Sequence, residues 1–161
     1  MLGRTYEGQN CSAARALEVV GERWSLLIIR DAMFKGVTRF GDFQQRLGVA
    51  TNILKARLDA FVEAGLMERR HLSGHPKHFA YVLTDKGLDL QPVIMALTAW
   101  GDRWDAPDGP PVHYRHTACG DTVHLETRCA GCGEVHSATE VVTRPGAAGP
   151  GRGEPRSDRA I

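Results

Sequence analysis

The sequence has 161 residues, a length that fits one ordinary domain or one domain with a small appendage. Its hydrophobic fraction of 42% and charged fraction of 24% are close to globular averages and allow a packed core. A formal net charge of only +1 excludes a wholly basic nucleic-acid coat and an acidic solvating chain, but not a local basic face. No apolar run reaches the roughly 18 residues of a membrane span, and residues 1–10 lack a signal core, so we expect a cytoplasmic protein without membrane contact.

Hydrophobic periodicity and helix-stopping glycines predict a series of helices in the first part of the chain. Four of them are expected at about residues 10–20, 24–35, 40–47 and 51–64. Asn10 and Thr51 are good N-caps for the first and the fourth helix, and Gly36 and Gly48 stand where the second and third should end. The second helix is apolar nearly all round in its first half, so it should be central.

Two extended runs, residues 66–72 and 78–83, flank a turn that contains Gly and Pro, and they predict a β-hairpin. Residues 84–87 then open a long last helix that reaches about Trp104, which Pro92 should kink or split in two. This order is that of a winged helix-turn-helix, a mainly α fold whose β-hairpin is the wing. One helix of such a motif fits the major groove of double-stranded DNA, which is about 12 Å wide.

The fourth helix, the helix before it and the hairpin tip form the predicted DNA-binding surface. Between residues 37 and 78, seven basic and four acidic residues give a local net charge of +3, which suits phosphate contact. Asn52 can pair with adenine, and Lys55 can reach guanine or a phosphate. The candidate DNA-binding residues are Arg39, Thr51, Asn52, Lys55, Ala56, Arg57, His75 and Lys77. Two alternatives stay open: solvated helix residues look the same, and Arg57 can instead anchor its helix through a salt bridge.

The chain changes character after this first domain, which we place at residues 10–105. Residues 106–112 are rich in Pro and Gly, as is typical of a linker. Residues 113–143 hold three of the four cysteines and four of the seven histidines, and this segment is too short to bury a core of its own. Residues 144–161 are dominated by Gly, Pro and Arg and predict a disordered tail.

Two short motifs of this segment have the spacing of metal-ligand pairs. Each has a two-residue gap that lets both side chains face one ion, followed by a Gly that permits the turn. The predicted ligands are His116, Cys119, Cys129 and Cys132. Three thiolates and one imidazole satisfy tetrahedral Zn²⁺, so we expect a structural zinc ion in a small zinc ribbon, with short strands around residues 123 and 135.

Alternatives to this zinc site also stay open. The imidazole ligand can come from another nearby histidine, namely His113, His124 or His136. The cysteines can instead be plain reduced thiols, or Cys129 and Cys132 can form a redox pair. A catalytic zinc is not expected because a closed four-ligand site leaves no open position for substrate, and the sequence has no nucleophile triad or nucleotide fingerprint of an enzyme.

Several motifs resemble, in their order and spacing, those of the HxlR-type winged-helix transcription regulators. They are Cys11 with residues 13–17, residues 21–31, residues 39–43, Leu54 with Arg57 and Leu58, residues 63–66, Tyr81 with residues 83–87, and Trp100 with Gly101. The resemblance covers about residues 11–104 and departs at Ser12, where the family often has Pro. It implies a homodimeric bacterial DNA-binding regulator, usually a repressor.

The resemblance also implies a dimer built from the first and last helices. The interface residues would be Leu17, Leu88, Ile94, Leu97, Trp100 and Trp104. The alternative is that Trp100 and Trp104 pack within the monomer. A two-fold dimer would bind a pseudo-palindromic operator with half-sites about 34 Å apart, or a multiple of that.

Cys11 stands at the expected start of the first helix, where free N–H groups and the helix dipole lower the pKa of a thiol. Some regulators of the family that this chain resembles sense oxidants or electrophiles through a cysteine here, which makes Cys11 a candidate redox sensor. The alternative is a small cysteine buried at the dimer seam. A different function, a protein-interaction adaptor that docks partners on the winged helix and the ribbon, also stays open.

Overall fold

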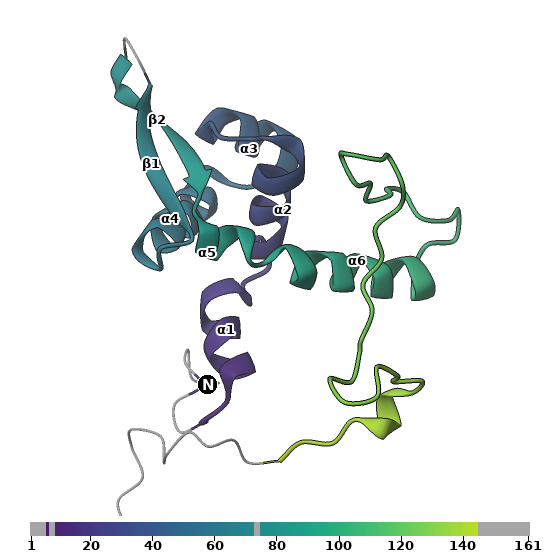
Figure 1. Cartoon of the computed structure of the whole chain (residues 1–161). Helices are drawn as coiled ribbons and strands as arrows, with labels where there is room; N and C mark the ends of the chain where they lie inside the picture. The colour runs from purple at the N-terminus through teal and green to yellow at the C-terminus, as the bar shows by residue number, and fades with distance from the viewer. Residues whose placement is uncertain (1–5, 7–8, 73–74, 145–161) are drawn as a thin grey trace, which may run out of the picture.

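The computed structural model describes residue 6, residues 9–72 and residues 75–144, with the backbone alone at residues 75–77. The elements are α1 (Ser12–Val20), α2 (Ser25–Lys35), α3 (Phe40–Leu47), α4 (Thr51–Glu63), β1 (Met67–Leu72), β2 (His75–Leu83), α5 (Asp85–Leu88), α6 (Gln91–Trp104) and the 3-10 turn η1 (Ala138–Glu140). Figure 1 shows α2, α3, α4 and the hairpin gathered in one body, with α6 passing beneath α2 and α1 projecting below it. This order and arrangement confirm the predicted winged helix-turn-helix. No helix of the described ranges is long and apolar enough to cross a membrane.

Helices α2 and α3 end at the predicted glycines. Gly36 and Gly48 adopt the left-handed conformation, with φ of 62° and 63°, which an L side chain rarely takes up. The sharp turn at Gly48 sends the chain through residues 49 and 50 directly into α4. The glycine stop therefore sets the spacing between the supporting helix and the helix that follows it.

The predicted N-caps, by contrast, are wrong. Cys11 occupies the N-cap position of α1, one residue after Asn10, and Ala50 occupies that of α4, one residue before Thr51. Asn10 Oδ1 instead accepts a hydrogen bond from Arg15 at 3.3 Å, and Thr51 Oγ1 accepts one from Gln44 Nε2 at 2.7 Å. The second of these bonds joins α3 to the first residue of α4.

The core is built around α2, as its apolar sequence predicts. Ile28 and Ile29 are completely buried in a cluster that also contains Phe43 of α3 and Phe61 of α4. The carboxylate of Asp31 lies in the same region with a side-chain exposure of 1%, and it is paired with three cations. These cations are Arg30 at 2.8 Å, Lys35 at 3.1 Å and Arg46 of α3 at 3.6 Å. Such pairing offsets the cost of burying a charge and fixes α3 against α2.

The wing is an antiparallel pair in which Met67 of β1 lies opposite Leu83 of β2. The segment that precedes α3 joins its edge: the Tyr81 N–H donates to the Thr38 carbonyl at 2.8 Å, and Arg39 forms a bridge with Ala80. The N-cap residue of α3, Arg39, is thereby attached to the root of the wing. Groups of α3 and of β2 are held on the same side of the molecule.

The last helix is split, as Pro92 predicts. α5 and α6 are separate helices, and Pro92 lies in the first turn of α6, where its missing N–H costs nothing. Gly87 of α5 packs so closely on the chain just before β1 that a Cβ there would lie 2.2 Å from the Leu66 carbonyl oxygen. A glycine is needed at this close approach.

The segment after α6 has little regular structure. Among the described residues it contains only η1 and a single bridge between Arg115 and Thr122, so the strands expected around residues 123 and 135 are not formed. The tail expected over residues 144–161 lies outside the described residues, apart from Arg144. Over its described residues this segment therefore shows no paired strands of a ribbon, and the zinc ion itself stays a prediction.

Candidate nucleic-acid interface

One face of α4 carries the side chains that the sequence assigns to base recognition. Leu54 and Leu58 are completely buried against the core. The 3.6-residue period of the helix then directs a different set of positions outward. The exposed positions on this face are Thr51, Asn52, Lys55 and Ala56. They occupy the leading half of α4, which is the half that enters a groove in helix-turn-helix proteins.

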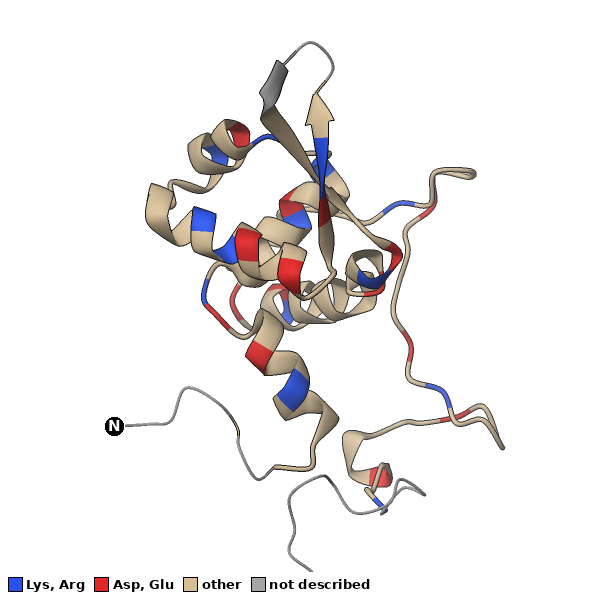
Figure 2. Ribbon diagram, turned by 90° about the vertical axis from the view of Figure 1, so that its left-hand side faces the viewer, with Lys and Arg blue, Asp and Glu red and all other residues tan. Residues whose placement is uncertain are grey.

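The charges on this face are paired within the protein. Lys55 Nζ lies 2.6 Å from Asp59 Oδ2, one turn later on α4. Arg69 of β1 also bonds the Asp59 carboxylate and lies over the ring of Tyr81. The hydrogen bond from Lys55 and then the charge of Arg69 hold the pKa of Asp59 below its usual range. Figure 2 shows these basic segments on α4 and on the wing, with the acidic positions of α4 toward its C-terminal end.

Arg69 is a member of this surface that the sequence-based site did not contain. Arg69 is one of the seven basic residues between positions 37 and 78, but its contact with α4 depends on how the hairpin folds against that helix. Arg57, which was part of that site, is three-quarters buried, with its Nη1 4.0 Å from Glu22 Oε1. This pair links α4 to the turn before α2, so the anchoring alternative describes Arg57 better than a leading DNA contact.

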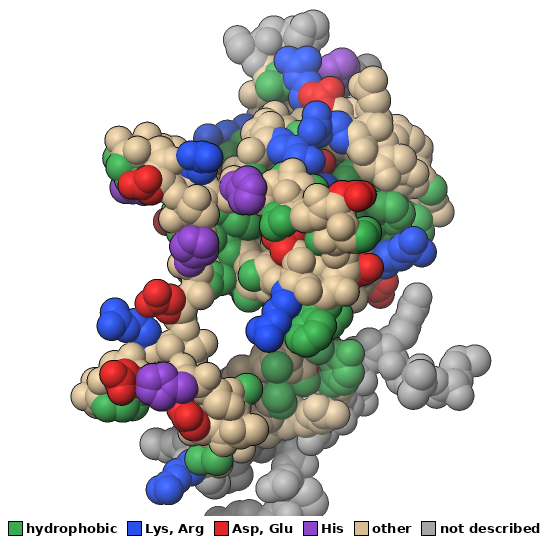
Figure 3. Space-filling model, turned by 90° about the vertical axis from the view of Figure 1, so that its right-hand side faces the viewer, with side chains coloured by type: hydrophobic (Ala, Val, Ile, Leu, Met, Phe, Trp, Pro, Cys, Tyr) green, Lys and Arg blue, Asp and Glu red, His purple; other side chains and the backbone are tan. Residues whose placement is uncertain are grey.

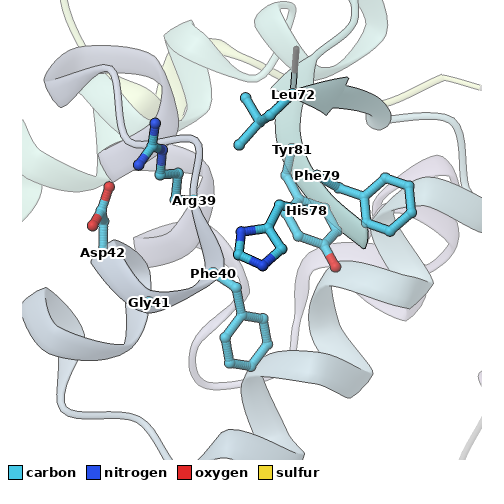
Figure 4. Close-up of a pocket in the computed structure, with 8 residues that line it drawn as sticks. All are labelled: Arg39, Phe40, Gly41, Asp42, Leu72, His78, Phe79 and Tyr81. Atoms are coloured by element: carbon cyan, nitrogen blue, oxygen red, sulfur yellow. The ribbon is translucent and has the colours of Figure 1, made fainter. Parts of the chain in front are cut away.

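A cleft lies between the beginning of α3 and the wing. It has a volume of about 410 Å³ and is lined by Arg39 to Asp42 on one side and by residues of β1 and β2 on the other. Figure 4 shows the His78 ring on the wing directed toward α3, with Phe40 below it and Arg39 and Asp42 across the cleft. Arg39 is exposed at the N-cap of α3. The side chains of His75 and Lys77 at the wing tip lie outside the described residues.

A second surface, on α1, α5 and α6, is apolar and exposed. Trp100 and Trp104 are 64% and 66% exposed, so they do not pack within the monomer. Leu17, Leu88 and Leu97 are exposed as well, and Figure 3 shows hydrophobic side chains gathered below the end of α6 and above α1. Ile94 was wrongly placed in this set: it is 3% exposed because it lies on the opposite face of α6, which packs against the core.

The predicted metal ligands form two pairs and not one site. His116 Nδ1 lies 3.2 Å from Cys119 Sγ. Backbone N–H groups of Cys132 and Gly131 point at the Cys129 sulfur and hold the pKa of that thiol below its usual range. Gly120 and Gly133, which follow the two pairs, have φ of 79° and 83°. Within the described ranges no three His, Cys, Asp or Glu side chains come together in a metal-binding geometry.

Cys11 lies at the N-terminus of α1 and is exposed in the single chain. The backbone N–H groups of Ala14 and then Ala13 lower the pKa of its thiol from the ordinary value. A more populated thiolate is a better nucleophile toward electrophiles and oxidants. The thiol is thus accessible, and its pKa is lowered by the N-terminus of α1.

Comparison with known proteins places these surfaces in context. Residues 19–109 match the family described as HxlR-like helix-turn-helix. The chain is 43% identical over 146 residues to Rv3095 of Mycobacterium tuberculosis, an uncharacterized HTH-type transcriptional regulator, and the match covers 90% of each chain. It is 31% identical over 93 residues to the HTH-type transcriptional regulator YodB of Bacillus subtilis, covering 57% of this chain and 82% of YodB.

Among solved structures, the crystal structure of the candidate transcription factor PA1607 is similar, with a TM-score of 0.75 and 42% identity. That match covers 85% of this chain and 96% of PA1607. The reduced form of YodB matches with a TM-score of 0.51 and 30% identity, over 62% of this chain and 98% of YodB. The matches to Rv3095 and PA1607 extend well past residue 109, so they include part of the segment that carries the cysteine pairs.

Proposed function

Because this chain belongs to the HxlR-like helix-turn-helix family and is a DNA-binding transcription regulator, we propose that it represses transcription as a homodimer on a pseudo-palindromic operator. It acts in the bacterial cytoplasm by occupying promoter DNA, without catalysing a reaction. The observation that carries this proposal is the face of α4, whose exposed leading positions project from a helix held rigidly by its buried leucines.

In this proposal α4 enters the major groove with Thr51 and Asn52 leading. The Asn52 amide reads adenine, Lys55 reaches guanine or a phosphate, and Ala56 leaves room for close approach. Arg39 contacts the backbone from the start of α3, and the wing tip, with His75 and Lys77, contacts the flanking strand. Arg69 adds a cation beside Lys55.

The homodimer is supported by the apolar surface on α1, α5 and α6. Large aromatic side chains exposed by more than half are unusual on a monomer and are typical of interaction sites. A two-fold axis through this surface makes a self-complementary interface. It also presents two copies of α4, whose separation of about 34 Å, or a multiple, sets the spacing of the operator half-sites.

We further propose that the two Cys-containing pairs bind a structural zinc ion. The donor set fits, because three thiols and one imidazole are a common tetrahedral zinc set. The N–H groups directed at the Cys129 sulfur stabilise a thiolate, the form that binds metal. A bound zinc ion would supply folding free energy of roughly 10 kcal/mol or more to a segment that has no core.

The inducing signal is proposed to be an oxidant or an electrophilic small molecule that modifies Cys11. Exposure and the lowered pKa of this thiol support the assignment, as does the existence of a reduced form of the related regulator YodB. Treatment of parent and Cys11→Ser proteins with diamide or a quinone tests it. The parent should lose operator binding and Cys11→Ser should keep it; equal loss in both excludes Cys11 as the sensor.

The regulator itself is tested by fluorescence-anisotropy titration of the promoter region of its own gene. Lys55→Ala should weaken binding and reduce the slope of log K against log salt by about 0.9, the value of one lost phosphate contact on duplex DNA. Arg144→Ala, which removes an equal charge far from α4, is the control and should bind as the parent does. Equal affinities for parent and Lys55→Ala at fixed salt contradict the assignment of α4. No specific binding by the parent would point to the adaptor function.

A further inference from the structure

We infer that the zinc sites are completed between two copies of this chain: His116 and Cys119 of one protomer bind the same ion as Cys129 and Cys132 of the partner subunit. This inference rests on the proposed dimer and the proposed zinc ion, and it adds which chain supplies each ligand. It follows from three features of the segment after α6: the turn geometry of each ligand pair, the placement of the two pairs on different sides of α6, and the exposure of the stretch that carries Cys129 and Cys132.

The first pair already has the donor spacing of half a tetrahedral site, and the second pair has the same type of turn. With Zn–S about 2.3 Å and Zn–N about 2.0–2.1 Å, two tetrahedral donors lie about 3.5 Å apart. His116 Nδ1 and Cys119 Sγ, at 3.2 Å, are close to that separation. The glycine after each pair is left-handed and donates its N–H back, Gly120 to the His116 carbonyl at 2.7 Å and Gly133 to the Cys129 carbonyl at 2.9 Å. Each turn therefore lacks only two further donors.

The first pair is fixed to its own winged helix. Tyr114 OH and Thr98 Oγ1 of α6 are 2.9 Å apart, and the Tyr114 ring packs against Phe34 of α2, with the ring planes tilted by 53° and a centroid distance of 4.9 Å. In Figures 1 and 2 the turn with His116 and Cys119 lies on one side of α6, and the stretch with Cys129 and Cys132 lies beyond the other side. Closing one site within this chain would require residues 126–144 to cross back over α6.

Residues 126–144, which we call the arm, do not cross back over α6. Within the described part of the chain, the hydrogen bonds of the arm join only residues of the arm. Val141 and Val142 are exposed by more than half. Figure 3 shows open space between the arm and the body of the winged helix. Holding a chain extended costs about 1–2 kcal/mol per residue in backbone entropy, so an arm of this kind needs contacts from elsewhere.

A second copy of this chain is the occupant that fits. The arm lies on the same side of α6 as α1, and this is the side on which the exposed apolar surface of α1 and α6 should receive a partner. A two-fold axis through that surface makes any exchange reciprocal, because each arm meets the first pair of the other chain. Both half-sites of both chains are then used, giving two complete four-ligand sites per dimer.

Mixed dimers test the exchange directly. One partner carries His116→Ala and Cys119→Ala, the other carries Cys129→Ala and Cys132→Ala, and mixed dimers are isolated through two different tags that do not bind metal. The exchanged arrangement leaves one complete site in each mixed dimer and none in either variant homodimer. A site closed within one chain leaves none in all three. Zinc is counted by mass spectrometry, and cobalt substitution reports thiolate ligation by its absorption.

A reciprocal mixture gives the opposite pattern. A chain with all four ligands replaced by Ala, paired with the parent, should hold no complete site if the ligands are exchanged, but one if they are not. A parent homodimer with two zinc ions whose mixtures follow the unexchanged pattern overturns the exchange and leaves the proposed zinc ion intact. A parent without zinc overturns both.

A second variant does not touch the ligands. Trp100→Glu with Trp104→Glu should prevent dimerisation while leaving the winged helix folded, because both side chains are exposed in the single chain. If the ligands are exchanged, the resulting monomer loses its zinc. A folded monomer that retains one zinc ion per chain contradicts the exchange.

Discussion

On the proposed recognition surface, Asp59 should compete with DNA for two cations. Its two carboxylate oxygens hold Lys55 of α4, at 2.6 Å, and Arg69 of β1. Neither cation can give a phosphate its full charge while it remains on this carboxylate. The substitution Asp59→Asn keeps the shape of the side chain and removes the charge, so it should increase the affinity for DNA.

The size of the gain follows from the exposure of the pairs. Exposed ion pairs are worth about 0.2–1 kcal/mol each. Freeing two cations should therefore improve the binding free energy by about 0.4–2 kcal/mol, or about 2- to 30-fold in affinity. If this surface meets the phosphates as proposed, removing a negative charge from it should add to this gain, although salt screens the effect beyond roughly 8 Å at physiological ionic strength.

The assay is anisotropy titration of a fixed operator duplex at one salt concentration. Glu63→Gln is the matched control, since it removes the same charge from the exposed surface of the same helix one turn later, where no ion pair is found among the described residues. We expect a gain for Asp59→Asn that clearly exceeds that of Glu63→Gln. Equal gains would show that only net charge matters, and no gain for Asp59→Asn would refute the competition.

Three further outcomes are expected. Gly48→Ala should lower the free energy of unfolding in urea by about 1–2 kcal/mol, because the left-handed backbone at φ 63° strains an L residue although the space around it is open. The same change at Gly41, which is helical and also open, should not destabilise the protein. Equal losses of stability for the two variants would contradict this reasoning. Ile94→Ala should lower the free energy of unfolding by about 2–5 kcal/mol, because it truncates a core side chain. Leu97→Ala should leave the unfolding of the single chain unchanged but weaken dimerisation, as measured by analytical sedimentation. The reverse pattern would show that the two faces of α6 are misassigned. The pKa of the Asp59 carboxyl is lowered in the folded chain, so its ion pairs stabilise the folded protein at pH values above the unfolded-state pKa, and this stabilisation is lost as the pH falls. The difference in unfolding free energy between parent and Asp59→Asn should therefore be largest near neutral pH and vanish in acid. A difference that does not depend on pH would argue against the ion pairs.

The sequence predicts those parts of the fold that depend on local backbone chemistry. Gly36 and Gly48 end their helices because only glycine adopts the left-handed conformation without strain, and Pro92 begins α6 because it cannot continue a helix. Such signals lie in single residues and can be recognised without knowing the packing. Much of the helix-turn-helix, including the bounds of α3, can be predicted from such single-residue signals.

Features that depend on tertiary partners could not be obtained in this way. Thr51 is a good N-cap by type, but Gln44 donates to its hydroxyl, and this competition appears only when α3 and α4 pack. Ile94 lies on a helix with two apolar faces, and periodicity alone does not say which face meets the core. Arg69 reaches Asp59 only because the hairpin folds onto α4.

The central claim is that two copies of α4 read one operator, and hydroxyl-radical footprinting on genomic sites bound by the protein tests it most directly. The account predicts two protected patches related by two-fold symmetry, with centres about 34 Å apart along the duplex, or a multiple of that. It also predicts that Asn52→Ala and Lys55→Ala reduce protection of both patches together. A single protected patch without symmetry, or protection that survives both substitutions, would contradict it.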